Sequence, residues 1–438
     1  MSARAARRAR PLTRRAVLAA TSAAATSAAL AACAAPGAPA SPASNVPTTP
    51  VTLSYLYFFG PDDPQSISLP FVLEEFKKKH PNITLEQTST SGGTGNVMEK
   101  FVAMSSAGTP ADVAAVNPQF IEPLRAKGAL ADLTSFVKRD TRTFQPEDFN
   151  EPTLARAIRE GKWTALPLQM GLWFFFYNAT ALTAAGIAKP DATWTWDKVM
   201  ESARAVRQRD PNSLGMTMPP YELPVRDNGG EILSPDEKRC VLDQPPAVEA
   251  IQWMGDLRQR HRVVPDPTET GGQAARALFD GGRYAFHVGD PGFLSASLRA
   301  KLAFDWDIAL VPKGRVAQVS TVKGPSLVMS QDSKQKEAAW AWLAHYNGAE
   351  MQKYVATNGK VISARKSALK AFVDLPEGYT KSVIDQTAKI AKPMPYVARF
   401  DEMDREISAG LGTVHSGQRT AREAMADVVQ KVNALLTG

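Results

Sequence analysis

Cysteine and histidine are scarce in this sequence. Its 438 residues include two cysteines, Cys33 and Cys240. The five histidines are scattered, at His80, His261, His287, His345 and His415. Neither residue type recurs at the short spacings of a metal site, so the sequence predicts no bound metal. Two thiols also exclude a disulfide-rich scaffold, and the stability of the fold must therefore come from its core.

The sequence also lacks the short motifs of common hydrolases and nucleotide-binding enzymes. It contains no G-x-S-x-G, H-E-x-x-H or phosphate-binding P-loop pattern. These absences argue against an enzyme, and we expect no cofactor. A secreted hydrolase stays open as a competing class, because glycoside hydrolysis uses a pair of carboxylates and any two acids of the sequence can meet in the fold.

The positive charge of the chain is confined to its beginning. The formal net charge is +7, with 51 basic and 44 acidic residues. Residues 1–32 hold six arginines and no acid, which leaves 45 bases against 44 acids in the rest of the chain. A nearly neutral body argues against binding to a nucleic-acid backbone.

The N-terminal segment has no apolar run long enough to span a membrane, because Thr21, Ser22, Thr26 and Ser27 interrupt it. Twin arginines precede this weakly apolar stretch, and Leu-Ala-Ala-Cys ends it at Cys33. The order resembles a twin-arginine export signal followed by a bacterial lipobox. We therefore predict that residues 1–32 are an export and lipoprotein signal and that Cys33 is lipidated.

Residues 33–50 are rich in proline, alanine and serine. Such a segment has little to bury and predicts a flexible tether between the lipidated Cys33 and the folded body. The predicted location is the extracytoplasmic face of the cell membrane, with the protein held there by its lipid anchor.

The sequence predicts that the folded body is a two-lobed α/β protein. Its length exceeds that of one ordinary domain, and strands predicted at 51–58, 83–86 and 113–116 alternate with helices, which favours a parallel sheet. The aromatic residues 173–177 indicate a buried strand or the wall of a binding cleft, and both hold if one end of the strand faces the cleft. Helix caps are predicted at Asn178, Thr195 and Thr420.

Six motifs occur in the order of a known family. They are F-K-K-K-H-P-N-I at 76–83, G-A-L-A-D-L at 128–133, the G-K to A-G-I stretch at 161–187, N-G-G at 228–230, G-R-Y-A-F at 282–286 and the segment 330–347. Over residues 51–438 the chain resembles the family 1 extracellular solute-binding proteins that serve sugar-type ABC importers, the maltose-binding-like group.

This resemblance implies two α/β lobes joined by crossing hinge strands. It also implies a monomer that captures a carbohydrate-type solute between its lobes and delivers it to the permease subunits of an ABC importer. A ligand sensor that docks on a membrane receptor shares the same fold and is an alternative.

The resemblance further implies how the chain is divided. The first lobe comprises 51–165 and a return at 320–360, and the second lobe comprises 166–319 and the C-terminal helices at 361–438.

Solute-binding residues are expected at strand ends and turns, where aromatic faces and planar polar groups meet sugar hydroxyls. In the first lobe and the hinge the candidates are Tyr57, Phe58, Asp62, Asn117, Gln119, Gln169 and Trp173. In the second lobe and the returning strand they are Tyr221, Arg226, Asp227, Asn228, His287, Gly289, Asp290, Gly324 and Arg399.

Several candidates have a purely structural interpretation as well. Tyr57 and Phe58 suit a core, His287 suits an apolar strand, and Arg226 and Arg399 suit ordinary ion pairs.

The sequence departs from the family at 289–293, where Gly-Asp-Pro-Gly-Phe replaces the usual Gly-x-Trp. The missing tryptophan argues against a maltose-like oligosaccharide. The remaining candidates for the solute are a smaller sugar, a polyol or a phosphorylated polyol. Paired arginines in the cleft would favour the phosphorylated polyol, which is an anion.

Overall fold

A computed structural model describes residues 46–60, 63–90, 94–369, 371 and 379–437. Residues 46–438 form one compact unit. The predicted signal, Cys33, most of the tether and Asp62 lie outside the described residues, so the proposals on them stay predictions. Within the described ranges, no helix is both long enough and apolar enough to cross a membrane.

The first of two larger sheets has five strands in the order β2-β1-β3-β11-β6. β1 pairs in parallel with β2 and β3, which confirms the predicted α/β arrangement, whereas β11 runs antiparallel to β3 and β6. The strands are β1 (Val51–Tyr57), β2 (Ile83–Ser89), β3 (Val113–Val116), β6 (Leu166–Pro167) and β11 (Ser326–Met329).

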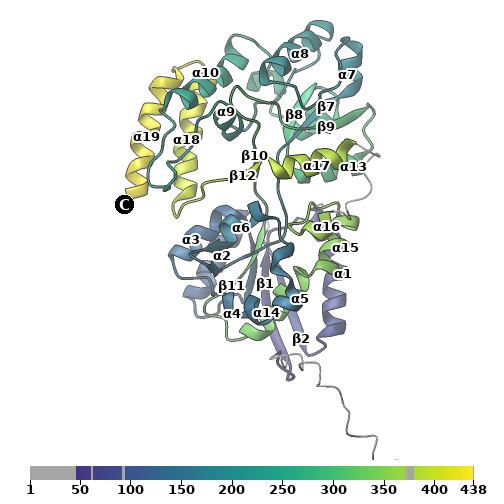
Figure 1. Cartoon of the computed structure of the whole chain (residues 1–438), viewed down its shortest axis with the longest axis vertical. Coiled ribbons are helices and arrows are strands. Elements are labelled where there is room, and N and C mark those ends of the chain that lie inside the picture. The colour runs from purple at the N-terminus through teal and green to yellow at the C-terminus, as the bar shows by residue number, and fades with distance from the viewer. Residues whose placement is uncertain (1–45, 61–62, 91–93, 370, 372–378, 438) are drawn as a thin grey trace, which may run out of the picture. The chain divides into compact units, whose positions relative to one another are not determined.

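The helices around this sheet come from two separate parts of the chain (Figure 1). The earlier ones are α1 (Pro64–Lys79), α2 (Thr94–Ser106), η1 (Pro118–Phe120), α3 (Ile121–Ala126), α4 (Thr134–Arg139), α5 (Thr141–Phe144), η2 (Pro146–Asp148) and α6 (Glu151–Ala157). The returning ones are α14 (Lys336–Tyr346), α15 (Ala349–Gly359) and α16 (Lys366–Leu369), and a short hairpin pairs β4 (Ile158–Arg159) with β5 (Lys162–Trp163).

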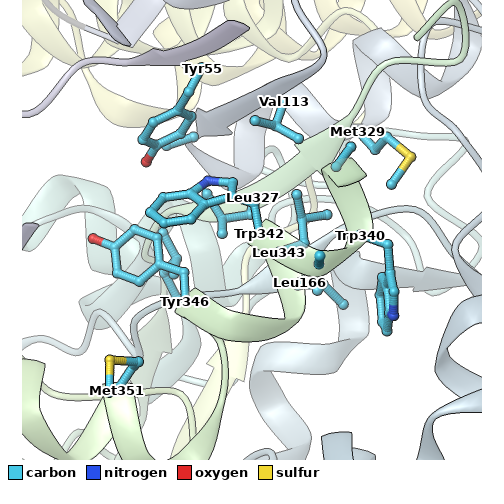
Figure 2. Close-up of a cluster of buried hydrophobic side chains, with 14 of the residues drawn as sticks. Tyr55, Val113, Leu166, Leu327, Met329, Trp340, Trp342, Leu343, Tyr346 and Met351 are labelled. Carbon is cyan, nitrogen blue, oxygen red and sulfur yellow. The ribbon is translucent and has the colours of Figure 1, made fainter. Parts of the chain in front are cut away.

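The core of this first lobe is built on α14 (Figure 2). Trp342 is fully buried, with its indole at an edge-on angle to the ring of Tyr55, 5.4 Å between centroids, and to that of Phe76 at 5.2 Å. The Tyr346 hydroxyl donates to Gln65 Oε1 at 2.7 Å, so this buried phenol is satisfied. The late helix α14 thereby packs against β1 and α1 and completes this core.

The second larger sheet has β7 (Phe174–Asn178) at its centre, antiparallel to β8 (Phe286–Gly289) and β9 (Trp306–Ala309). Every residue of β7 is buried. Phe175 and Tyr177 pack on one face of the sheet, and Phe174 and Phe176 on the other. The aromatic run is therefore a strand with two apolar faces, as predicted.

The helices of the second lobe frame this sheet and a helical layer at the C-terminus (Figure 1). They are α7 (Ala179–Ala184), α8 (Trp196–Arg209), α9 (Glu222–Asp227), α10 (Pro245–Gln259), α11 (Pro267–Thr270), α12 (Ala275–Asp280), α13 (Pro291–Ala300), α17 (Tyr379–Lys389), α18 (Phe400–His415) and α19 (Ala421–Thr437). β10 (Ser320–Val322) pairs in parallel with β12 (Ala391–Pro393).

The three predicted caps are present at the starts of α7, α8 and α19. The Asn178 side chain accepts from Ala181 N–H at 2.9 Å, and Thr195 Oγ1 accepts from Lys198 N–H at 3.2 Å. Thr420 Oγ1 accepts from Glu423 N–H at 3.3 Å, while the Glu423 carboxylate accepts from Thr420 N–H at 3.0 Å. Each bond satisfies a backbone donor that the first helical turn leaves free.

Three crossing segments connect the lobes and bond to one another through their backbones. Gly171 and Lys323 exchange two N–H to carbonyl bonds of 2.7 Å each. Met170 N–H donates to the Ile362 carbonyl at 2.8 Å, which adds the third segment. The crossings lie near the predicted ones, and the residue boundaries of each lobe stay a prediction.

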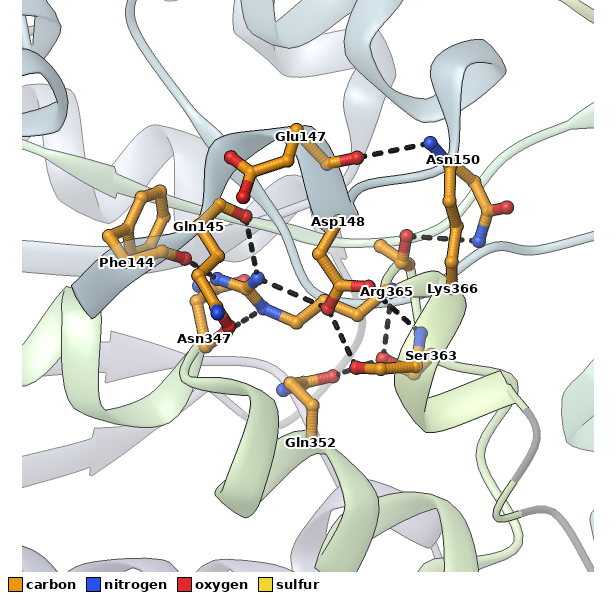
Figure 3. A network of polar contacts seen from close by, with 12 residues as sticks. Phe144, Gln145, Glu147, Asp148, Asn150, Asn347, Gln352, Ser363, Arg365 and Lys366 are labelled. Carbon is orange, nitrogen blue, oxygen red and sulfur yellow. Dashed lines mark hydrogen bonds and ion pairs between the residues drawn. The ribbon is translucent and has the colours of Figure 1, made fainter. Parts of the chain in front are cut away.

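The third crossing is fixed to the first lobe by Arg365 (Figure 3). This side chain is fully buried, and its guanidinium donates to the carbonyls of Phe144 at 2.7 Å and Gln145 at 3.0 Å and to that of Asn347. It also pairs with Asp148 at 3.4 Å. One cation therefore satisfies three backbone acceptors and a carboxylate.

We expect Arg365→Met to lower the free energy of unfolding by about 3 kcal/mol, because it leaves these buried acceptors without a donor. Denaturant unfolding followed by far-ultraviolet circular dichroism measures the change. The matched control is Arg419→Met, which removes an exposed pair with Asp427 and should cost less than about 1 kcal/mol. Equal losses for the two variants would contradict this role of Arg365.

Candidate functional site

A cavity of about 620 Å³ lies where the crossing segments meet residues of both lobes. The crossing segments contribute Gln169, Gly171, Leu172, Trp173, Lys323, Gly324 and Pro325. The first lobe contributes Phe58, Phe59, Asp63, Pro64, Asn117, Pro118, Gln119 and Val361. The second lobe contributes Pro220, Tyr221, Glu222, Asp290, Pro291, Gly292, Ser295, Thr321, Met394, Tyr396, Phe400 and Asp404.

The first-lobe wall is formed by the ends of parallel strands. β1 ends at Tyr57 and is followed by Phe58, and β3 ends at Val116 and is followed by Asn117. Because β1 and β3 are parallel neighbours, their carboxyl ends lie at the same edge of the sheet. This edge is the usual ligand site of open α/β sheets.

Three amide side chains on the lining have unused hydrogen-bonding capacity. Asn117, Gln119 and Gln169 are half-buried. Asn117 precedes η1 without capping it, and none of the three side chains bonds to another group within the part of the chain that the structure describes. Each amide offers a donor and an acceptor, the combination that pairs with a hydroxyl group.

Trp173, Glu222 and Lys323 form a charged cluster in the cavity wall. The Glu222 carboxylate is almost fully buried, accepts from Trp173 Nε1 at 3.0 Å and pairs with Lys323 Nζ at 3.0 Å. The ammonium of Lys323 also lies over the Trp173 ring, 4.5 Å from its centroid. The cluster holds the indole in place and neutralises one buried carboxylate.

Two more carboxylates on the lining begin helices. Asp63 Oδ1 accepts from Gln65 N–H at 2.8 Å at the start of α1, and Asp290 Oδ1 accepts from Phe293 N–H at 2.9 Å at the start of α13. Both are helix N-caps, so part of their charge is offset by the positive end of a helix dipole.

Half of the sequence-predicted site residues line the cavity. These eight are Phe58, Asn117, Gln119, Gln169, Trp173, Tyr221, Asp290 and Gly324. Asp62 lies outside the described residues. That the eight contact a solute is a proposal, which the structure motivates by bringing them together.

Three predicted residues around α9 have structural partners elsewhere. Arg226 is buried, pairs with Glu231 at 3.0 Å and donates to the Pro393 carbonyl at 3.1 Å. Asp227 is fully buried, and its carboxylate accepts from Trp196 Nε1 and Val319 N–H. The Asn228 amide donates to the Pro246 carbonyl at 2.8 Å and lines a separate hollow of about 310 Å³ beside Trp196 and Trp253.

Tyr57 and Arg399 also lie off the lining. Tyr57 packs against Tyr55 in the first-lobe core, 5.3 Å between ring centroids, and Arg399 is exposed and pairs with Glu402. Arg226 and Arg399 therefore form ordinary ion pairs, which was their structural interpretation from the sequence. The cavity therefore lacks the pair of arginines that would favour an anionic solute.

His287 and Gly289 belong to the buried strand β8. The His287 ring lies 4.1 Å from that of Phe293, and its Nδ1 is 3.1 Å from Thr217 Oγ1. Burial lowers the pKa of His287 to about 3, so the imidazole is neutral at ordinary pH. A Cβ at Gly289 would come within 2.8 Å of the Phe176 ring, which explains the glycine by packing.

Sequence reasoning missed several residues of the lining, among them Glu222, Thr321, Lys323, Tyr396 and Asp404. Glu222 follows the predicted Tyr221, and Lys323 precedes the predicted Gly324. A prediction that also took the sequence neighbours of each candidate would have included both. Asp404 lies inside a charged helix, α18, where neighbouring acids and bases look alike in sequence.

The sequence matches the family described as bacterial extracellular solute-binding protein over residues 62–353, well over half of the chain. Among solved structures, an ABC substrate-binding protein from Listeria monocytogenes in complex with cycloalternan has a TM-score of 0.80 at 20% identity, covering 89% of this chain and 99% of its own. The chain is thus similar in fold to that protein.

Two further structures extend this comparison. Maltose-bound MalE3 of T. maritima has a TM-score of 0.73 at 23% identity and covers 88% of this chain and 99% of its own. UgpB from Mycobacterium tuberculosis in complex with glycerophosphocholine has a TM-score of 0.75 at 18% identity, with coverages of 89% and 99%. At such identities the likeness shows the two-lobed fold and leaves the solute open.

The buried carboxyl of Asp227, which is off the lining, predicts that stability depends on pH. Burial raises its pKa to about 7, although Trp196 Nε1 at 2.9 Å and Val319 N–H at 2.7 Å donate to its oxygens. The unfolded value is about 4, so the folded state binds the proton more tightly between about pH 4 and 7. The contribution of Asp227 to the free energy of unfolding therefore falls as pH rises through this window and is constant above it.

We expect Asp227→Asn to remove this contribution. The melting temperature of the variant relative to the unsubstituted protein should rise between about pH 4 and 7 and stay level above that. Thermal unfolding in a pH series measures the difference. A difference that is the same at every pH would contradict the prediction.

Proposed function

The chain belongs to the bacterial extracellular solute-binding proteins, and on this premise we propose that it captures a carbohydrate-type solute in the cavity between its lobes and delivers it to an ABC importer. The match over residues 62–353 supports the family that the sequence motifs resemble. In this role the protein binds and releases its solute unchanged, so the site needs no catalytic residue and no cofactor.

The observation that carries the proposal is the chemistry of the cavity lining. Aromatic side chains from both lobes, including Phe58, Trp173 and Tyr221, can cover the C–H faces of a sugar ring. The three unpaired amides supply donors and acceptors for hydroxyl groups. Cycloalternan and maltose, the solutes of two proteins of this fold, are carbohydrates.

The proposal extends to how the protein works at the membrane. A solute that touches both walls of the cavity stabilises the arrangement of the lobes in which both contacts are made, and so shifts the population toward it. The permease subunits would recognise this form. We further propose that the protein is a monomer and that lipid on Cys33 holds it at the extracytoplasmic face of the membrane. Residues 33–50 then form a flexible tether between the membrane and the folded body.

Binding of carbohydrates to the purified protein tests the proposal. A sugar or polyol present at 100 times its dissociation constant should stabilise the folded protein by about 2.7 kcal/mol, which a thermal-shift screen detects. Isothermal titration then gives the affinity of each hit.

The variant Gln119→Ala removes an unpaired amide of the lining and should weaken binding of the hit by roughly five- to tenfold, the worth of one hydrogen bond. The matched control is Gln386→Ala, an exposed amide on α17 that bonds only to Ser382 within the described residues. Equal affinities of the two variants, or the absence of any carbohydrate hit, would contradict the proposed site.

A further inference from the structure

Acidic side chains outnumber basic ones on the lining of the cavity, although a neutral sugar needs no charged partner. Its described lining residues include four carboxylates and a single cation, Lys323. The carboxylates are Asp63, Glu222, Asp290 and Asp404. Whether this excess matters depends on what compensates each negative charge.

Three of the four carboxylates have compensation within the protein. Asp63 and Asp290 cap the N-termini of α1 and α13, where backbone N–H groups and the helix dipole favour a negative charge. Glu222 pairs with Lys323 at 3.0 Å and accepts from Trp173 at the same distance. The single cation of the lining is therefore already engaged.

Asp404 is different. It projects from α18 into the lining, is half-buried, and makes no hydrogen bond or ion pair with any residue that the structure describes. Burial raises the pKa of this carboxyl; the charge of Glu222 raises it further, while Lys323 opposes them. A partly desolvated carboxylate without a counter-ion is costly, and a bound cation would relieve that cost.

Asp404 lies close to two tyrosines of the same wall. Burial, followed by the charges of Glu222 and Asp404, raises the pKa of the Tyr221 hydroxyl. Burial and the same two carboxylates also raise the pKa of Tyr396. Tyr221, Tyr396 and Asp404 line the same cavity, and aromatic faces suit an ammonium group as well as a sugar ring.

Unpartnered hydroxyls on the same lining point independently to a polar ligand. Thr321 is fully buried, and its Oγ1 has no hydrogen-bond partner in the described part of the chain. The Tyr221 hydroxyl is buried and unpartnered in the same way. Buried hydroxyls are normally bonded, so these two leave hydrogen-bonding capacity unused in the wall of the cavity.

We propose that the solute carries a protonated amine, as in an amino sugar or an aminated polyol, and that Asp404 is its counter-ion in the cavity. This inference rests on the proposed function and narrows its solute class. It also argues against a phosphorylated polyol, because neither Arg226 nor Arg399 reaches the lining to meet an anion.

The test compares sugars with a protonated amine against neutral and anionic sugars of similar structure. Glucosamine and its dimer are each titrated into the purified protein at pH 7 and compared with their N-acetylated forms. Glucose and glucose 6-phosphate are titrated in the same way. We expect the amines to bind roughly tenfold to a hundredfold more tightly than their neutral counterparts, the range for a hydrogen bond to a charged group. The phosphate ester should bind most weakly.

Asp404→Asn should abolish the preference, so that the amines and their neutral counterparts bind to this variant with similar affinities. Because Asp404 has no partner among the described residues, the melting temperature of the Asp404→Asn variant should not fall. A lost amine preference at an unchanged melting temperature is then not caused by misfolding. The matched control is Asp401→Asn, an exposed carboxyl one turn earlier on α18 and off the lining, which should keep the preference.

The outcomes separate the two claims. Neutral sugars that bind as tightly as the amines, or an amine preference that survives in Asp404→Asn, would overturn this inference and leave the proposed function standing. Failure of every carbohydrate in the wider screen would overturn the proposed function and this inference with it.

Discussion

The contact of the crossing segments is the constraint on which the rest of the structure depends. Gly171 and Lys323 exchange backbone hydrogen bonds, and Gly324 adopts a φ of +119°, a conformation that favours glycine. A Cβ at Gly324 would lie 2.6 Å from the Gln169 carbonyl oxygen, and one at Gly171 would lie 2.9 Å from the Lys323 carbonyl carbon. The lack of side chains lets the segments touch, and this contact places Trp173 and Lys323 at the base of the cavity.

The electrostatics of the cavity follow from that placement. Lys323 arrives on a crossing segment and is engaged by Glu222 and the Trp173 ring. It is therefore poorly placed to serve a second carboxylate. The N-caps of α1 and α13 bring two more acids to the lining, for reasons of helix geometry, and Asp404 adds an acid that forms no hydrogen bond or ion pair within the described chain. The cavity thus combines a carbohydrate-like surface with an excess of negative charge.

Local chemistry was predictable from the sequence, and long-range placement was only partly so. The Asn178 and Thr195 caps and the parallel strands follow from short-range rules of hydrogen bonding and alternation. Strand ends predicted Asn117 as a solute-binding residue, and the structure places it on the lining because topology brings such ends to one edge. Whether Arg226 turns toward the cavity or toward Glu231 depends on the packing of segments far apart in the chain. The position of Asp404 on α18 depends in the same way on how the C-terminal helices pack.

The most direct test of this account is a crystal structure of the protein with a bound carbohydrate. We expect the solute to lie in the cavity, to stack on Trp173 and to contact polar groups of both lobes, with Gln119 on one side and Tyr221 on the other. A solute held by one lobe alone, or bound in the smaller hollow beside Trp253, would contradict the claim that the crossing segments build the binding site.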